Sequence, residues 1–251
     1  LDRSSAASDV YKRQIEHWCR IPTEVELAHE FRYRDPIVNE KTLIVALSQS
    51  GETMDTLMAV RHAREQGAKV ISICNTHGST LPRESDAALY THAGPEIAVA
   101  STKAFLAQIT AAYLLGLYLA QLRGNKYKDE IASILAELQN MPAKIQKVLD
   151  NDTQVKELGV EMKDASSVIF LGRHVGFPVA MEGALKLKEI TYIHAEGFAA
   201  GELKHGPIAL IDEGQPVIVV VPSANGRDSL HGKVVSNIQE VRARSAFTCL
   251  L

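Results

Sequence analysis

A cluster of polar side chains follows the first strongly apolar run of the sequence, LIVAL (43–47). Its members with a hydroxyl or amide group are Ser48, Gln49, Ser50 and Thr53. The apolar run predicts a buried strand, and the helical spacing of residues 54–67 predicts a helix after it. Backbone N–H groups at a helix N-terminus attract anions, so the loop 48–53 is a candidate phosphate site. The alternative is an ordinary turn in which Thr53 or Asp55 caps the helix.

A second set of residues has the spacing expected for acid–base chemistry. Lys186 and Glu189 are three residues apart in a predicted helix, so they lie on one face, with Glu182 one turn earlier. The apolar neighbours indicate that this helix is largely buried. A partly buried carboxylate beside an ammonium is a candidate general base. The alternative is an exposed ion pair that contributes little to stability.

Two further groups lie in predicted loops. Lys204 and His205 stand among glycines and a proline in residues 191–211, ahead of a predicted strand. Because imidazole titrates near neutral pH, His205 is either a proton shuttle or a turn residue. Ser101 and Thr102 precede a long apolar helix, where their hydroxyls either cap the helix or reach the ligand held by the loop 48–53.

Strands that alternate with helices position these groups. The alternation predicts an α/β fold with mostly parallel, doubly wound sheets. A strand, a glycine-bearing loop and a helix recur from Ser167, which predicts two similar domains. The uncharged stretch 104–122 is long enough to span a membrane, but its polar residues favour a core helix. We expect four divisions of the sequence: a foreign leader (1–14), a first domain (15–125), a helical connector (126–165) and a second domain (166–251).

Composition limits the kinds of partner and compartment. The net charge is −3 with 23% charged residues and no basic stripe, so we expect neither nucleic acid nor membrane as a partner. The three cysteines are scattered and the nine histidines lack ligand spacing, which predicts no disulfide framework and no metal. The first residues contain no apolar signal segment, so we expect a cytoplasmic protein.

Three segments of the sequence together resemble one family. They are SQSGET (48–53), GPEIAVASTKAF (94–105) and EGALKLKEITYIHAEGFAAGELKHGP (182–207). They resemble the isomerase half of the glutamine–fructose-6-phosphate aminotransferases, also called glucosamine-6-phosphate synthases. That half has two sugar isomerase (SIS) domains, and the enzyme makes glucosamine 6-phosphate for amino-sugar and UDP-N-acetylglucosamine synthesis. SQSGET alone marks only the broader class of SIS domains, whereas the third segment is far more specific.

The resemblance implies a role for each matching residue and no cofactor. Residues that bind the phosphate or line the sugar are then Ser48, Gln49, Ser50, Thr53, Val99 and Ser101. Glu189 corresponds to the base that moves a proton between C1 and C2, Lys186 to its partner at a sugar hydroxyl, and His205 to the group that opens the ring. In this family the histidine loop comes from the neighbouring subunit, which implies a homodimer and fructose 6-phosphate as substrate.

The sequence also departs from the family. It contains no glutaminase domain, no first strand with its serine-bearing loop in the first SIS domain, and no lysine-bearing carboxy-terminal tail. The ending AFTCLL (246–251) looks foreign. We therefore expect a fragment with a truncated first and second domain, inactive by itself. The alternatives are a non-catalytic phosphosugar-binding module and a stand-alone phosphosugar isomerase or deaminase.

Overall fold

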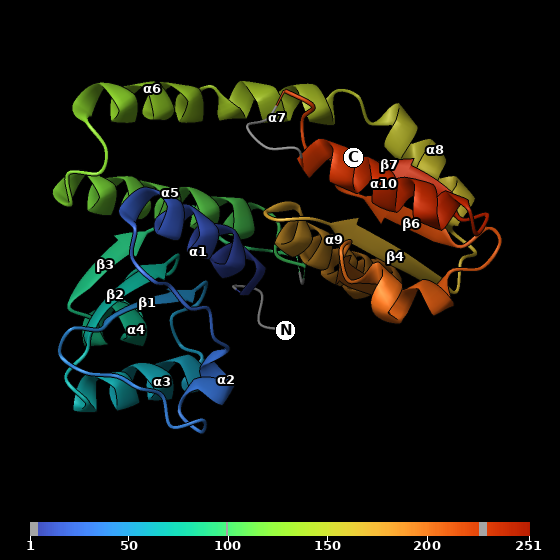
Figure 1. The fold of residues 1–251 in the computed structure, drawn as a ribbon. Coiled ribbons are helices and arrows are strands. Elements are labelled where there is room, and N and C mark those ends of the chain that lie inside the picture. Colours follow the sequence, from blue (N-terminus) through green and yellow to red (C-terminus); the bar gives the residue numbers. More distant parts are fainter. Residues whose placement is uncertain (1–4, 99, 226–229) are drawn as a thin grey trace. The chain divides into compact units, whose positions relative to one another are not determined.

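The computed structural model describes residues 5–98, 100–225 and 230–251, which form two compact units (Figure 1). Unit 1 comprises the described residues up to Arg123, and unit 2 those from Gly124 to Leu251. Both contain a parallel sheet with helices, as the alternation of strands and helices predicts.

Unit 1 contains a three-stranded parallel sheet in the order β1-β2-β3. Its elements are α1 (Ser5–Cys19), α2 (Ala28–Phe31), β1 (Leu43–Ser48), α3 (Met54–Glu65), β2 (Lys69–Cys74), α4 (Thr80–Glu84), β3 (Ala87–Tyr90) and α5 (Lys103–Leu122). Leu43 pairs with Lys69 and Ser48 with Cys74, so β1 and β2 end level. The predicted helix end at Gly67 is confirmed, because α3 stops just before this residue, which has a φ of +92°.

Helices cover both faces of the unit 1 sheet, α3 and α4 on one and α1 and α5 on the other (Figure 1). The alternation of side chains along β1 explains this arrangement. Ala46 packs with Leu57 of α3, whereas Val45 contributes to a cluster with Tyr11 of α1 and Leu115 of α5. The apolar run 43–47 therefore packs against helices on both faces of the sheet.

The apolar helix α5 is, among the described residues, the one helix long and apolar enough to cross a membrane. It lies against α1 and contacts β2. Its buried residues recur at helical spacing and include Ala104, Gln108, Ala111, Ala112 and Leu115. Contact with α1 and β2 accounts for much of its apolar composition, as expected for a core helix.

The described part of the expected leader, residues 5–14, is helical. These residues belong to α1, and Tyr11 is only 3% exposed. Tyr11, Ile15 and Trp18 are spaced at four and three residues, so they lie on one face of the helix. The apolar face of α1 therefore begins before residue 15, and the expected boundary at 14/15 falls inside a helix.

A cavity of about 800 Å3 borders β1, which is an edge strand of the described sheet. Five consecutive residues, 43–47, line it. Successive side chains of a strand point to opposite faces, so a cavity lined by all five runs along the strand's edge. The Tyr11 side chain also lines it, and its buried hydroxyl has no hydrogen-bond partner among the described residues.

Unit 2 begins with three helices and continues into a four-stranded parallel sheet in the order β5-β4-β6-β7. The helices are α6 (Lys128–Gln139), α7 (Met141–Leu149) and α8 (Thr153–Met162). The other elements are β4 (Ser167–Gly172), α9 (Gly176–Thr191), β5 (His194–Ala199), the 3-10 helices η1 (Leu203–His205) and η2 (Pro207–Leu210), β6 (Pro216–Val219), α10 (Leu230–Arg242) and β7 (Phe247–Leu250). The predicted helical connector thus corresponds to α6, α7 and α8.

The unit 2 core has two layers, one on each face of the sheet. Phe170 of β4 packs with Ala180 and Ala184 of α9, whereas Leu171 packs with residues of α10. The ending that looked foreign forms β7, which pairs in parallel with β6. The tail therefore extends the sheet in this structure.

Candidate functional site

The loop between β1 and α3 uses its serines to hold its own backbone. Ser48, 7% exposed, accepts a hydrogen bond from the Gly51 N–H at its Oγ (3.0 Å), and Ser50 Oγ accepts one from the Glu52 N–H (3.2 Å). Thr53 occupies the N-cap position of α3 but makes no side-chain capping bond. The capping alternative is therefore wrong for Thr53, whose exposed hydroxyl is left available to a ligand.

The loop that follows β2 contacts this turn. The Gln49 carbonyl accepts hydrogen bonds from the N–H groups of Asn75 and Thr76 (3.3 and 3.2 Å). Gly51 has a φ of +68°, and a Cβ at this position would lie 2.1 Å from Ser79 Oγ. Only glycine fits this close approach without a shift of its neighbours.

Glu52 is the acidic residue within the loop, and its carboxylate is bound elsewhere. Oε1 accepts a hydrogen bond from the Thr80 N–H at the start of α4 (2.7 Å). Hydrogen bonding to Thr80 holds the pKa of this carboxyl below its ordinary value. The rest of the loop offers hydroxyls and the N-terminus of the 12-residue helix α3, a suitable setting for an anion.

Glu96, which the sequence prediction passed over, organises the start of α5. Its Oε2 accepts hydrogen bonds from the Ala104 N–H (3.2 Å) and from Ser101 Oγ (3.4 Å). Thr102 is the N-cap residue but makes no side-chain capping bond. Ser101, 6% exposed, is therefore oriented by Glu96, and Val99 lies outside the described residues. Glu96 lies seven residues before the first residue of α5, outside the first turn where acidic residues signal a helix start, so the sequence carries no local signal for this cap.

The candidate acid–base residues of α9 come together as predicted. Lys186 Nζ lies 2.6 Å from Glu189 Oε2 and 3.4 Å from Glu182 Oε1. The exposed fraction of the side chain is 18% for Lys186, 19% for Glu189 and 8% for Glu182. The alternative of a solvent-exposed ion pair is therefore wrong. One ammonium shared by two carboxylates gives a largely buried cluster with a formal charge of −1.

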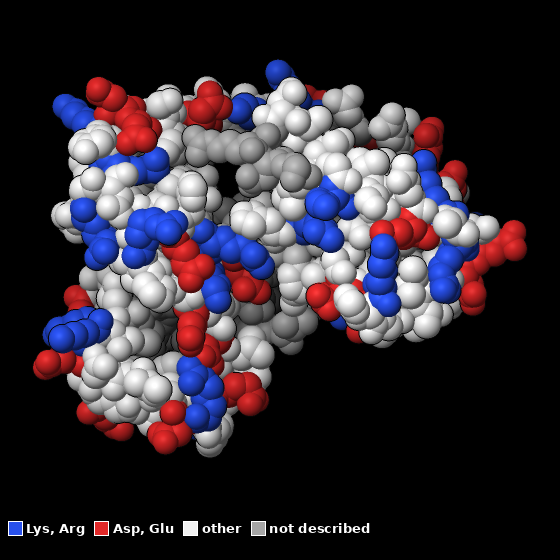
Figure 2. All heavy atoms as spheres, viewed as in Figure 1, with Lys and Arg blue, Asp and Glu red and all other residues white. Residues whose placement is uncertain are grey.

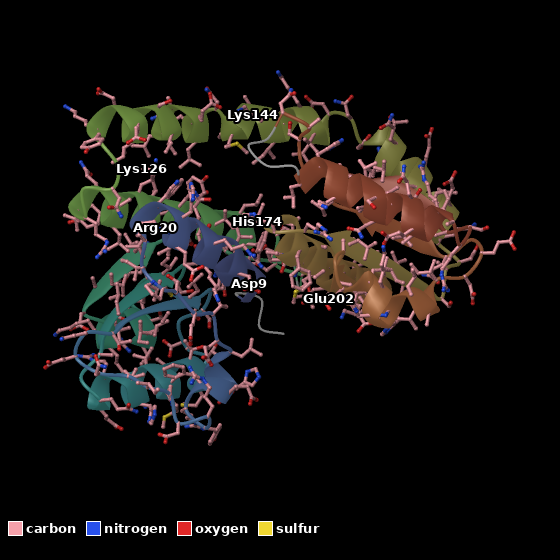
Figure 3. All side chains as sticks on the ribbon, viewed as in Figure 1. Asp9, Arg20, Lys126, Lys144, His174 and Glu202 are labelled. Carbon is pink, nitrogen blue, oxygen red and sulfur yellow. The ribbon has the colours of Figure 1, made fainter. Side chains whose placement is uncertain are left out.

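His205 lies in η1 and is exposed. Its backbone N–H donates to the Glu202 carbonyl (2.9 Å), and Gly206 follows with a φ of +145°. Glu202 is labelled in Figure 3 in the turn that follows β5, and His174 in the loop between β4 and α9. The imidazole of His205 is thus presented to the outside of unit 2.

Charges of both signs are interspersed on the face of the molecule drawn in Figure 2. Among the described residues, no group of three or more His, Cys, Asp or Glu side chains could hold a metal ion.

Comparison with protein families identifies these domains. The model of the SIS domain family matches residues 3–118 and 161–250. The chain belongs to the SIS domain family. The two matched regions correspond to the sheets of units 1 and 2, and the unmatched residues between them include α6 and α7.

The similar proteins narrow this assignment to the isomerase half of one enzyme family. Glutamine–fructose-6-phosphate aminotransferase of Corynebacterium glutamicum is 78% identical over 245 residues, which cover 98% of this chain and 39% of that protein. The Streptomyces coelicolor protein of the same name is 65% identical over 242 residues. Among solved structures, the C-terminal domain of the Francisella tularensis aminotransferase has a TM-score of 0.95 and 44% identity, covering 100% of this chain and 70% of that domain.

A more distant structure shows how widely the fold is shared. Glucosamine-6-phosphate deaminase of Thermotoga maritima has a TM-score of 0.77 at 22% identity, covering 100% of this chain and 73% of the deaminase. This similarity concerns the fold alone. The chain spans 39% of the length of the Corynebacterium relative, so it corresponds to part of a longer enzyme.

Proposed function

We propose that the chain is the isomerase part of an enzyme that converts fructose 6-phosphate and glutamine-derived ammonia to glucosamine 6-phosphate. The observation that carries the proposal is the largely buried contact of 2.6 Å between Lys186 and Glu189. A module that only senses phosphosugars needs the phosphate loop but no general base. The retention of this pair with His205 therefore favours an enzyme.

The phosphate of the sugar would be held by the loop after β1. The α3 N-terminus and the hydroxyl of Thr53 supply donors, and the braced turn keeps them in place. Gln49 and Ser50 are proposed to contact the phosphate as well, and Ser48 is the fourth loop residue assigned to the phosphate site. Val99 and Ser101 are proposed to line the sugar, and the start of α5 would then face the same ligand.

Glu189 would carry the proton in the isomerisation. Opening of the ring, assisted by His205, exposes the carbonyl carbon C2, where ammonia condenses with loss of water to give an imine. The Glu189 carboxylate then removes a proton from C1. The C1–H electron pair forms the C1–C2 double bond, and the C2–N double-bond pair moves to the nitrogen, which takes up a proton. Transfer of the proton from Glu189 to C2, with loss of the C1 hydroxyl proton, gives the C1 aldehyde of the amino aldose. Lys186 would stabilise the developing charge on the sugar oxygen, and this route requires no cofactor or metal.

The assembly and location of the complete enzyme belong to the same proposal. The exposed His205 loop suits a residue that acts in the site of a neighbouring subunit, so we propose a homodimer in the cytoplasm. We assign no nucleic acid or membrane partner. The chain itself covers less than half of its relatives, and we propose that it does not synthesise glucosamine 6-phosphate alone.

The test uses the complete enzyme with Glu189→Gln. The amide preserves size but cannot accept the proton, so exchange of the C1 hydrogen with deuterated water should fall by about 10²-fold or more. Binding of fructose 6-phosphate, measured by calorimetry, should change little. Exchange at the wild-type rate in the Gln variant would disprove the assignment.

A further inference from the structure

A chain of polar contacts in unit 2 connects the loop after β4 to the turn that carries His205. Arg173 donates from Nε to Asn237 Oδ1 on α10 (3.0 Å). Asn237 Nδ2 donates to Glu240 Oε2 (3.1 Å), and Glu240 Oε1 lies 2.8 Å from Lys204 Nζ. Lys204 directly precedes His205 in η1, so the contacts reach the proposed proton shuttle.

The central residue of these contacts, Asn237, is 5% exposed. Its neighbours on α10, Val234, Ile238 and Val241, belong to the apolar core. An amide in such surroundings is costly unless both its carbonyl and its NH2 group are hydrogen-bonded. Arg173 and Glu240 satisfy the two ends, which fixes the orientation of the amide and of both its partners.

Glu240 is the charged end of these contacts, with 18% of its side chain exposed. Burial raises the pKa of its carboxyl, but hydrogen bonds from Lys204, Asn237 and Ser236 outweigh burial and lower the pKa below its ordinary value. The group is therefore ionised at neutral pH. Its bond to Lys204 is charge-assisted, which makes it stronger and more directional than a neutral one.

The turn before His205 is held at two more points. Leu203 is fully buried in the core on the α10 side of the sheet. The Arg173 guanidinium lies against Gly201, where an added Cβ would be 2.9 Å from Nη2. The Lys204 side chain is 62% exposed, and its ammonium contacts Glu240.

We propose that Glu240 is a positioning residue for His205, acting through Lys204 and held in place by Asn237. The effect of Glu240 on catalysis rests on the function proposed above, whereas its effect on the structure of the turn can be tested without that function. Glu240 contacts Lys204 and Asn237. It fixes the turn from which His205 projects, and so sets where the imidazole lies.

The structural test measures amide hydrogen exchange by NMR on the full 251-residue chain carrying Glu240→Ala. The His205 amide, which donates to Glu202, should exchange about tenfold faster than in wild type, while amides of β4 keep their protection. The matched control is Glu137→Ala, which removes a carboxylate 2.7 Å from Lys144 on other helices. It should leave His205 unchanged.

A second variant covers the case in which Glu240→Ala unfolds. Lys204→Met removes only the exposed partner, and it should also accelerate exchange at His205. Unchanged exchange at His205 in a folded Glu240 or Lys204 variant would overturn the proposal.

The catalytic test uses the complete enzyme and two substrates, the closed-ring sugar phosphate and an open-chain analogue. His205→Ala should slow turnover of the closed-ring sugar more than that of the analogue. Glu240→Ala should show the same selectivity with a smaller loss, about threefold to tenfold in kcat, and an unchanged KM. Equal losses for both substrates would contradict positioning. If His205→Ala itself shows no selectivity, its ring-opening role fails, and hydrogen exchange still decides whether Glu240 holds the turn.

Discussion

Lys186 Nζ lies 2.6 Å from Glu189 Oε2, and less than a fifth of either side chain is exposed. The same ammonium also contacts Glu182, so its removal takes a nearby cation away from two carboxylates at once. This makes Lys186 structurally important as well as a proposed catalytic group. Its removal should therefore be visible without any substrate.

Lys186→Met should destabilise unit 2 by about 1–3 kcal/mol at pH 7, because both carboxylates lose the ammonium in a poorly hydrated site. Urea unfolding at pH 7 measures the loss. The control Lys156→Met removes an exposed partner of Asp152 (2.6 Å) and should cost less than about 0.5 kcal/mol. Equal losses of unfolding free energy in the two variants would show that burial of Lys186, Glu182 and Glu189 does not make their contacts more stabilising than an exposed ion pair.

Ser50→Ala combined with Thr53→Ala should weaken binding of the phosphorylated sugar in the complete enzyme. The two hydroxyls are proposed phosphate donors, whereas the free sugar has no phosphate to hold. Calorimetry with fructose 6-phosphate should show a loss of about tenfold or more, from two hydrogen bonds to a charged group. Fructose itself should bind the variant and the wild type alike. A similar loss for both sugars would mean that the loop does not recognise phosphate.

Gly51→Ala should destabilise the phosphate loop in two ways. A non-glycine residue at a φ of +68° costs about 1–2 kcal/mol, and the new Cβ would overlap Ser79. Gly78→Ala provides the control, because Gly78 has a φ of +71° with nothing within 4 Å of its added Cβ. Chemical denaturation should show a larger loss for Gly51→Ala. Equal losses of stability in Gly51→Ala and Gly78→Ala would show that the loop shifts to relieve the overlap between the new Cβ and Ser79.

The chain as it stands should not produce glucosamine 6-phosphate from fructose 6-phosphate, even with excess ammonium. It spans only 39% of its Corynebacterium relative, and its first sheet ends at β1 beside a cavity. The assay measures the amino sugar formed by the purified chain against a complete isomerase half. Comparable turnover would show that these residues suffice for the chemistry.

Most of the apolar strands could be predicted from the sequence, but β5 was not, and neither was β7, whose residues FTCL were expected to be a foreign ending. The run at 43–47 is apolar throughout, and the structure confirms a strand there. The β5 segment HAEGFA contains charged residues and a glycine, which argue against a strand. Packing explains the glycine, because a Cβ on Gly197 would lie 2.8 Å from Met181 Cα. Such a close approach of α9 is a tertiary constraint that no local pattern contains.

Helical spacing was sufficient for part of the candidate site. The separation of Lys186 and Glu189 predicted their contact, since it follows from one helix. The role of Glu96 at the start of α5 depends on a loop that folds back toward the helix, and spacing does not reveal it. The apolar stripe of α1 was present in the sequence, at Tyr11, Ile15 and Trp18. The expected boundary at 14/15 separates Tyr11 from Ile15, and so divides this stripe between two segments.

The edge of β1 has a consequence for how this chain behaves in solution. Backbone groups on the outer side of an edge strand can template another strand, and here a cavity of about 800 Å3 leaves room along it. At rising concentration the chain should therefore self-associate through this edge. A soluble peptide of alternating β-branched residues that pairs with β1 should suppress the association.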